Sequence, residues 1–140
     1  MNEIQKRAFR SEDLLKMDYY DRSPSDYESS RYLETIEPNV TFIQCGKVVL
    51  CGGLNIFYPG CAEAWIFISK NPGASVPMGA KILLDQWIRQ YHLRRVQALT
   101  LADWKEGRRF LEWLGMRCEA DRMIQSSVDG KDQAMYARVI

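Results

Sequence analysis

Residues 62–91 read AEAWIFISKNPGASVPMGAKILLDQWIRQY, and this stretch decides the fold. Its first eight residues are apolar on both alternating faces, which is typical of a central strand covered on both sides. Residues 71–77 are rich in glycine and proline, which indicates a loop that leads into a helix beginning near Gly79. Apolar residues then recur at helical spacing: Ala80, Leu83, Leu84, Trp87, Ile88 and Tyr91. The stretch therefore predicts a buried strand, a small-residue loop and an amphipathic helix.

The residues before this stretch predict a β-hairpin. Residues 40–45 and 48–57 are strand-like and flank a Gly46-Lys47 turn. The Gly52-Gly53 pair inside the second strand indicates a bulge or a close approach of the backbone. Further upstream, residues 3–9 suggest a short first strand, and Ser11 has the character of a helix N-cap. The polar residues 19–39 are expected to hold one short helix at 27–37.

More elements are expected after the central helix. Residues 96–101 form a short strand, and Asp103 and Glu106 have the spacing of a capping box. The helix that they open should end at Gly115, because glycine is favoured just after a helix. Residues 116–124 and 135–140 complete the chain as two strands. The order of elements predicts an α/β fold with a mixed sheet in one domain, residues 1–140.

Composition excludes several classes of function. The net charge of +1 gives no reason to expect nucleic acid or an anionic membrane as a partner. No apolar run approaches the ~20 residues of a membrane span, and the N-terminus lacks a signal-peptide core. The four cysteines are expected to be free thiols, with Cys45 and Cys51 buried in strands. One histidine and scattered cysteines predict no metal site.

The order of these elements resembles the GNAT superfamily of acyl-CoA N-acyltransferases over nearly the whole chain. Its local matches are AEAWIFIS with the loop and helix that follow, and WKEGRRFLEWLGM at residues 104–116. The resemblance implies a mixed sheet of six or seven strands flanked by helices, with the strands at 62–69 and 96–101 as parallel neighbours. Size and the RRFLEWLGM ending are also similar to small GNAT-like proteins of tailed phages.

The resemblance implies acetyl-CoA as co-substrate. The family binds its pyrophosphate through backbone N–H groups in a Q/R-x-x-G-x-G/A motif at a helix start. The matching positions here are Ser75, Met78 and Ala80, of which only Ala80 fits, while Gly79 lies beside the expected glycine. An ordinary strand-to-helix connection would have the same composition, so a structural role for this loop is the alternative.

The family's chemistry implies further site residues. A backbone N–H near Phe67, Ile68 and Ser69 would stabilise the oxyanion formed when an amine attacks the thioester. Glu63 is the candidate general base, unless it merely lies at the exposed start of its strand. Leu111 occupies the position of the usual tyrosine acid, so Tyr136 is the candidate substitute, with packing as its alternative role.

Trp104 stands where the family has asparagine, a departure at the position of a second cofactor contact that the resemblance implies. The sequence thus predicts an acyl-CoA-dependent N-acetyltransferase acting on an unidentified amine, in the cytoplasm. A catalytically silent GNAT-fold structural or binding protein, such as a phage virion component, is the second hypothesis. An unrelated α/β domain is the third. A homodimer and contacts with phage-particle proteins both stay open as partners.

Overall fold

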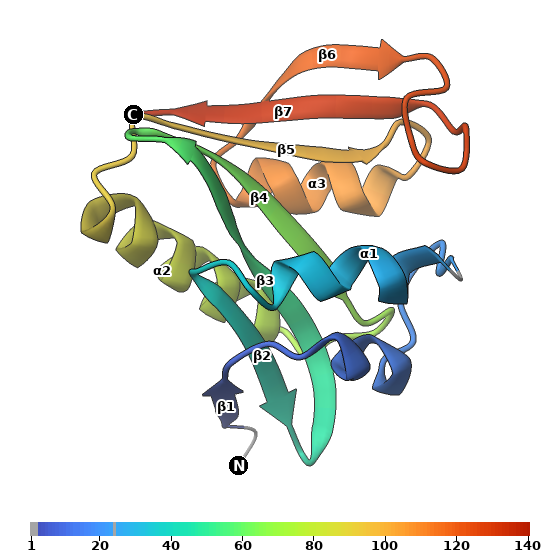
Figure 1. The fold of residues 1–140 in the computed structure, drawn as a ribbon, viewed down its shortest axis with the longest axis vertical. Helices are drawn as coiled ribbons and strands as arrows, with labels where there is room; N and C mark the ends of the chain where they lie inside the picture. The colour runs from blue at the N-terminus through green and yellow to red at the C-terminus, as the bar shows by residue number, and fades with distance from the viewer. Residues whose placement is uncertain (1–2, 24) are drawn as a thin grey trace. The chain divides into compact units, whose positions relative to one another are not determined.

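The computed structural model describes residues 3–23 and 25–140. Within these residues the chain forms a seven-stranded mixed sheet with the order β1-β2-β3-β4-β5-β7-β6 (Figure 1). The expected α/β fold with six or seven strands is therefore confirmed. In chain order the elements are β1 (Ile4–Arg7), the 3₁₀ helix η1 (Ser11–Lys16), α1 (Ser25–Leu33), β2 (Asn39–Gln44), β3 (Lys47–Tyr58), β4 (Cys61–Ile68), α2 (Ser75–Gln90), β5 (Arg95–Leu101), α3 (Lys105–Trp113), β6 (Arg117–Met123) and β7 (Gln133–Val139).

The parallel pair in this sheet is β4 with β5. Their register joins Cys61 to Arg95, Ala62 to Val96 and Glu63 to Gln97. The pairs β1–β2, β2–β3, β5–β7 and β6–β7 are antiparallel. The parallel arrangement of the strands around residues 62–69 and 96–101 is thus confirmed.

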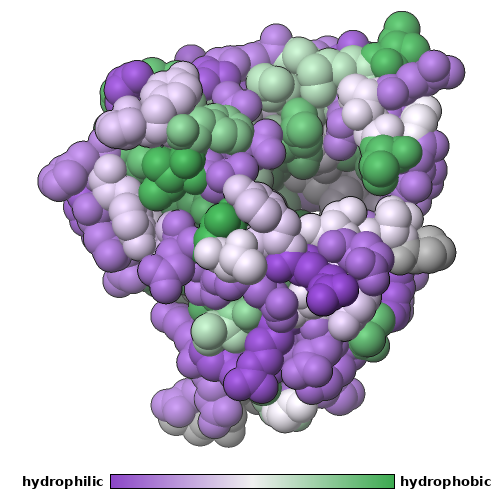
Figure 2. Space-filling model, in the orientation of Figure 1, coloured by the Kyte–Doolittle hydropathy of each residue, from purple (hydrophilic) through white to green (hydrophobic). Residues whose placement is uncertain are grey.

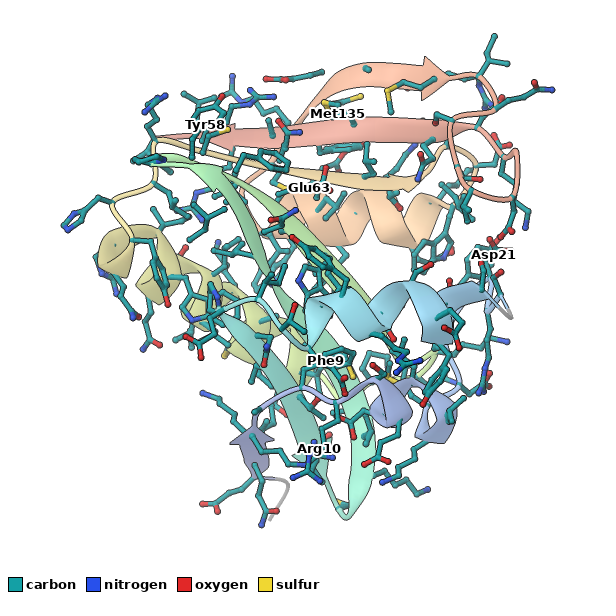
Figure 3. The ribbon with its side chains drawn as sticks, in the orientation of Figure 1. Phe9, Arg10, Asp21, Tyr58, Glu63 and Met135 are labelled. Atoms are coloured by element: carbon teal, nitrogen blue, oxygen red, sulfur yellow. The ribbon has the colours of Figure 1, made fainter. Side chains whose placement is uncertain are left out.

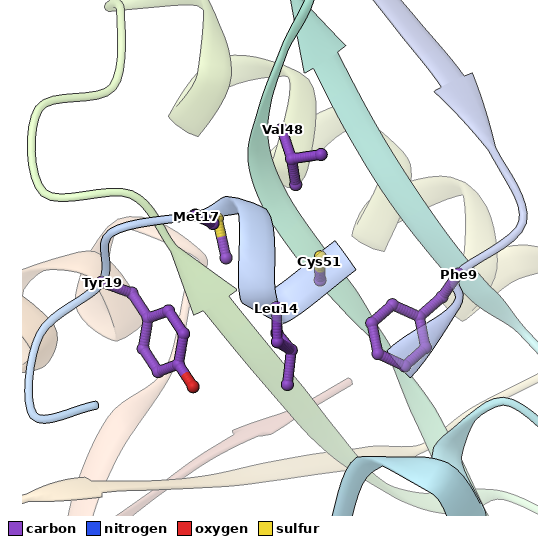
Figure 4. Packing of buried hydrophobic residues seen from close by; sticks show 6 residues of the cluster. All are labelled: Phe9, Leu14, Met17, Tyr19, Val48 and Cys51. Atoms are coloured by element: carbon purple, nitrogen blue, oxygen red, sulfur yellow. The ribbon is translucent and has the colours of Figure 1, made fainter. Parts of the chain in front are cut away.

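The chain forms two compact units. The first contains the residues up to Asn55 together with Ala64–Ala80, and the second contains Ile56–Glu63 and Lys81–Ile140. The first unit contains a cluster of buried apolar side chains (Figure 4): Phe9, Leu14, Met17, Tyr19, Val48 and Cys51. Trp65 and Phe67 of β4 pack against this cluster, and the Trp65 ring meets Phe9 edge to face at a centroid distance of 4.9 Å. Burial raises the pKa of the Cys51 thiol to about 12, which keeps it protonated.

A buried ion pair links β1, η1 and β2 in the first unit. The carboxylate of Asp13 is fully buried and accepts hydrogen bonds from the Arg7 guanidinium at 2.6 and 2.8 Å. It also accepts from the Thr41 hydroxyl at 2.7 Å and from the Arg10 N–H at 3.0 Å. Burial opposes ionisation of Asp13, but these donors outweigh it and hold the pKa of the carboxyl below its usual value.

In the second unit, α3 and the part of α2 from Lys81 onward lie on the same face of β5, β7 and β6. Arg138 of β7 donates to Asp85 Oδ1 of α2 at 2.7 Å and to the Leu114 carbonyl after α3 at 3.1 Å. Tyr136 lies on the same face of β7 as Arg138, since side chains two residues apart point the same way. Its hydroxyl is 3.4 Å from Glu112 of α3. The opposite face of β5, β7 and β6 carries no helix of this unit.

Strand β6 ends the sheet order and is largely exposed. Its sequence, RCEADRM, places charged groups along its length. Glu119 forms an ion pair with Arg95 at 2.7 Å, and Asp121 forms one with Arg108 at 2.8 Å. Arg122 bridges Asp103 and Asp132.

Two predicted helix caps are wrong. Ser11 is the first residue of η1 and not its cap, because the Asp13 carboxylate accepts the Arg10 N–H. The capping box at Asp103 and Glu106 does not form. Trp104 occupies the N-cap, and Asp103 pairs instead with Arg122. At Asp103, Arg122 takes the carboxylate that local spacing assigned to a cap, whereas Asp13 both caps η1 at Arg10 and pairs with Arg7.

The end of α3 and the close approach at Gly53 were predicted correctly. Gly115 has φ +94°, and the Met116 N–H donates to the Leu111 carbonyl at 3.0 Å. A Cβ on Gly53 would collide with the carbonyl oxygen of Pro38. The hairpin turn falls one residue earlier than predicted. Cys45 therefore lies in the turn at φ +52° and is exposed, although all four cysteines are free as expected.

No helix within residues 3–23 and 25–140 is long and apolar enough to cross a membrane. In the same residues, no group of three or more His, Cys, Asp and Glu side chains is arranged to hold a metal ion.

Candidate functional site

Glu63 lies inside β4, at the third position of the parallel ladder. Its side chain is half-buried and shares a face of the strand with Trp65 and Phe67. Among the described residues, its carboxylate has no hydrogen-bond or ion-pair partner. A half-buried carboxylate without a partner retains its full capacity to bind an ammonium group or to accept a proton.

The C-terminal end of β4 contains the backbone groups expected near the oxyanion. The Ser69 N–H donates to the Val49 carbonyl of β3 at 3.0 Å, so this donor is already used. Backbone N–H groups alternate in direction along a strand, so the Ile68 N–H points away from β3. Of Phe67, Ile68 and Ser69, Ile68 is thus the residue whose donor is directed away from the β3 ladder.

The loop before α2 is held by a side chain from β2. Gln44 is buried, and its Nε2 donates to Ser75 Oγ at 2.9 Å. A Cβ on Gly73 would lie 3.1 Å from Gln44 Oε1, so Gly73 leaves room for this contact. The Val76 N–H donates to the Gly73 carbonyl at 3.0 Å, and Pro77 has no N–H. Of the first three residues of α2, Ser75 is therefore the one whose N–H does not donate to the preceding loop.

The helix begins at Ser75, earlier than the start near Gly79 that the sequence indicates. The N–H groups of Met78, Gly79 and Ala80 consequently lie beyond the first turn and bond to carbonyls within the helix. A Cβ on Gly79 would lie 3.3 Å from both Ile4 Cδ1 and Phe42 Cε2, so Gly79 faces β1 and β2. Met78 is 56% exposed. Of these predicted cofactor residues, Ser75 is the one positioned as a free donor at the helix start.

Helix α3 departs from the expected tyrosine acid. Leu111 is 4% exposed and packs into the second unit. Trp104 lies at the N-cap, and a Cβ on Gly107 would collide with its ring and approach Thr100 Oγ1 at 2.5 Å. The glycine at 107 therefore accommodates the tryptophan at 104.

Tyr136 is 2% exposed and lies opposite Ala98 and Cys118 in the sheet. Its hydroxyl is 3.5 Å from Arg108 Nη1 and 3.4 Å from Glu112 Oε2. Burial raises the pKa of this hydroxyl against the opposing effect of Arg108. Tyr136 is thus a weaker acid than a free tyrosine, which favours its packing role.

Solved structures of acetyltransferases share this architecture over nearly the whole chain. Ard1 from Thermoplasma volcanium superposes with a TM-score of 0.73 at 16% identity, covering 98% of this chain and 97% of that one. A GNAT-family acetyltransferase from Bacillus anthracis superposes with a TM-score of 0.68 at 18% identity, covering 99% of this chain and 96% of that one. The chain has the GNAT fold.

A third structure with the GNAT fold was solved with a ligand. It is the phosphinothricin acetyltransferase from Sinorhizobium meliloti in complex with AcCoA. It superposes with a TM-score of 0.66 at 17% identity, covering 98% of this chain and 88% of that one. No sequence-family model and no curated protein sequence matches the chain.

Sequence patterns missed two residues that organise this GNAT fold. Gln44 holds the loop before α2 from a strand 31 positions away. Arg108 donates to the Ala102 carbonyl at 2.7 Å and to the Asp121 side chain, and so ties α3 to the ends of β5 and β6. Neither contact leaves a local signal, because each depends on the register of distant strands.

Proposed function

We propose that this protein is an acyl-CoA-dependent N-acetyltransferase that acetylates an amine. The observation that supports this proposal is the full-length match to GNAT acetyltransferases, one of which was solved with AcCoA. Acetyl-CoA would supply the acetyl group as an activated thioester.

Residues at the start of α2 are proposed to hold the phosphates. A helix of 16 residues presents free N–H groups and the positive end of its dipole at its N-terminus. Ala74 and Ser75 are exposed there, and Gln44 fixes the loop through Ser75. The exposed side chain of Met78 lies on the next turn and would border the bound phosphates.

Glu63 is proposed as the general base and the Ile68 N–H as the oxyanion donor. Glu63 would accept a proton from the acceptor's ammonium group, which frees the nitrogen lone pair for attack. The new C–N bond would form as the C–S bond breaks, while the Ile68 N–H stabilises the charge on the carbonyl oxygen. Because Leu111 replaces the usual tyrosine, water would protonate the departing thiolate, and Tyr136 stays a candidate for this role.

Ligand binding tests the cofactor part of the proposal. Acetyl-CoA at a hundredfold excess over its Kd should add ~2.7 kcal/mol to the free energy of unfolding. For a chain of this size the melting temperature should rise by several degrees. The Met78→Glu variant places a carboxylate beside the phosphates and should weaken acetyl-CoA binding at least about tenfold, or ~1.4 kcal/mol. Calorimetry on the folded variant with unchanged affinity would show that the phosphates bind elsewhere.

The catalytic part is tested by Glu63→Gln. The amide keeps the shape of the side chain but cannot accept the proton, so kcat should fall by roughly 10² to 10⁴ with little change in acetyl-CoA affinity. Glu37→Gln is the matched control, because Glu37 is exposed and lies outside the proposed site. Equal rates for Glu63→Gln and wild type would remove Glu63 from the mechanism.

A second candidate function is a catalytically silent structural or binding module. It is favoured by one observation, namely that Leu111 has no proton to donate and the Tyr136 hydroxyl is buried, with its pKa raised by that burial. A folded protein whose melting temperature does not respond to millimolar acetyl-CoA would favour this second function.

A further inference from the structure

The sheet face that carries Glu63 also carries a group of apolar side chains in the second unit. Residues paired across a sheet share a face, so the registers assign Glu63 to the face of Gln97 on β5 and Ala137 on β7. The next positions along these strands are Leu99 and Met135, which pair with each other. Figure 3 labels Glu63 and Met135 on their strands.

We name the apolar group on this side the open face. It consists of Leu99, Leu101, Ala120, Met123 and Met135, which the registers of β5, β7 and β6 bring side by side. None of these residues is buried, and Leu99 is 38% exposed. The helices of this unit lie on the opposite side of the strands, where Arg138 bonds to Asp85 and Leu114. On the face of the molecule that Figure 2 shows, apolar residues are interspersed with polar ones.

Among the described residues, Glu63 is the carboxylate on this side of the strands that forms no ion pair. Arg95 lies on the same face of β5, two residues before Gln97, which is the partner of Glu63. Its charge is neutralised by an ion pair with Glu119 at 2.7 Å. Arg117 lies in the same row as Glu63 across three strand spacings, about 14 Å away. The residues between them, Gln97 and Ala137, are uncharged. The open face therefore borders a single unpartnered carboxylate.

From this juxtaposition we propose that the acceptor is a primary amine with an apolar substituent. This inference rests on the proposed function and names the substrate class of the same site. Strand spacings place the Leu99 backbone about 8 Å from that of Glu63. The ammonium group binds the Glu63 carboxylate, and the apolar substituent lies on Leu99 and Met135. A polar amine of equal charge gains the contact with Glu63 but not the apolar contact with Leu99 and Met135.

Acetylation of two amines tests this specificity. Phenethylamine should be acetylated with a kcat/KM at least about tenfold above that of ethanolamine, because contact with an apolar surface is worth about this much or more. Leu99→Gln should lower kcat/KM for phenethylamine about tenfold and change that for ethanolamine less than about threefold. Ile124→Gln is the matched control, because Ile124 is 76% exposed and lies outside the open face. Equal use of both amines by the wild type would overturn the proposal.

A binding measurement separates this inference from the proposed function. With ¹³C-methyl methionine, the Met135 resonance, assigned from Met135→Leu, should shift with phenethylamine and not with ethanolamine. Glu63→Gln should weaken the binding of phenethylamine at least about tenfold, since it removes the charge that pairs with the ammonium group. A Met135 shift without any acetylation would overturn the acetyltransferase function and leave the amine-binding face standing. Acetylation without a Met135 shift would overturn the open face and leave the acetyltransferase.

Discussion

Replacement of Gly79 by glutamate tests how α2 packs in the first unit. The added Cβ would lie 3.3 Å from both Ile4 Cδ1 and Phe42 Cε2, which is tighter than ordinary contact. Crowding of this kind costs about 1–3 kcal/mol. A carboxyl group directed at Phe42 adds the cost of burying a polar group without a partner, about 1–3 kcal/mol. Better helix propensity returns up to ~1 kcal/mol.

The net loss for Gly79→Glu should be about 3 kcal/mol, which lowers the melting temperature by about 10 °C for a chain of this length. Met78→Glu is the control, because the neighbouring side chain is 56% exposed. It should stay within about 0.5 kcal/mol of wild type, with a small gain from the helix dipole. Thermal unfolding followed by circular dichroism measures both. If Gly79→Glu and Met78→Glu had the same melting temperature, α2 would not contact β1 and β2 through Gly79.

Further predictions concern the ion pair of Asp13 with Arg7 and the contact of Gly107 with Trp104. Asp13→Asn should lower the free energy of unfolding, measured in urea, by about 3 kcal/mol, because Arg7 loses its buried partner. An unchanged urea midpoint of unfolding would contradict the stabilising role of the ion pair. The pKa of Asp13 is lowered in the folded state, so its stabilisation is complete above pH ~4 and is lost as the pH falls through the lowered value. The difference between wild type and Asp13→Asn should therefore shrink below pH ~4, and a constant difference would refute this. Gly107→Ala should cost about 1–3 kcal/mol, and Trp104→Asn in the same chain should recover the part due to the ring while the contact with Thr100 Oγ1 remains. Additive losses would show that residues 104 and 107 do not interact.

Local patterns were sufficient for the middle of the fold. The strand before the small-residue loop, the amphipathic helix and the next strand each had a periodicity that matched their burial. The glycine at 115 marked a helix end because its backbone angle is positive, a property of the residue itself.

Helix starts were less predictable, because their caps compete with distant partners. Asp103 has cap-like spacing, yet its carboxylate pairs with Arg122, and the box at the start of η1 forms between Arg10 and Asp13 and leaves out Ser11. An arginine forms stronger charge-assisted bonds than a backbone N–H does. Which arginine lies within reach depends on the tertiary fold, and spacing along the chain does not contain that information.

The candidate site shows the same limit. Glu63 stood out in the sequence as a carboxylate in an apolar strand, and the structure places it inside the parallel ladder. Its relation to Leu99 and Met135 depends on the registers of β4, β5 and β7, and a shift by one residue would move those side chains to the other face. Hydrophobic periodicity alone does not specify that register.

The charged edge strand β6 restricts how copies of this protein can associate. A second strand that docked along β6 would bring its own side chains against Arg117, Glu119 and Arg122, and would remove water from their charged groups and from the ion pairs with Arg95 and Asp132. Desolvating such groups opposes the extension of a sheet from one molecule into the next. Self-association by addition of a strand should therefore avoid this edge of the sheet.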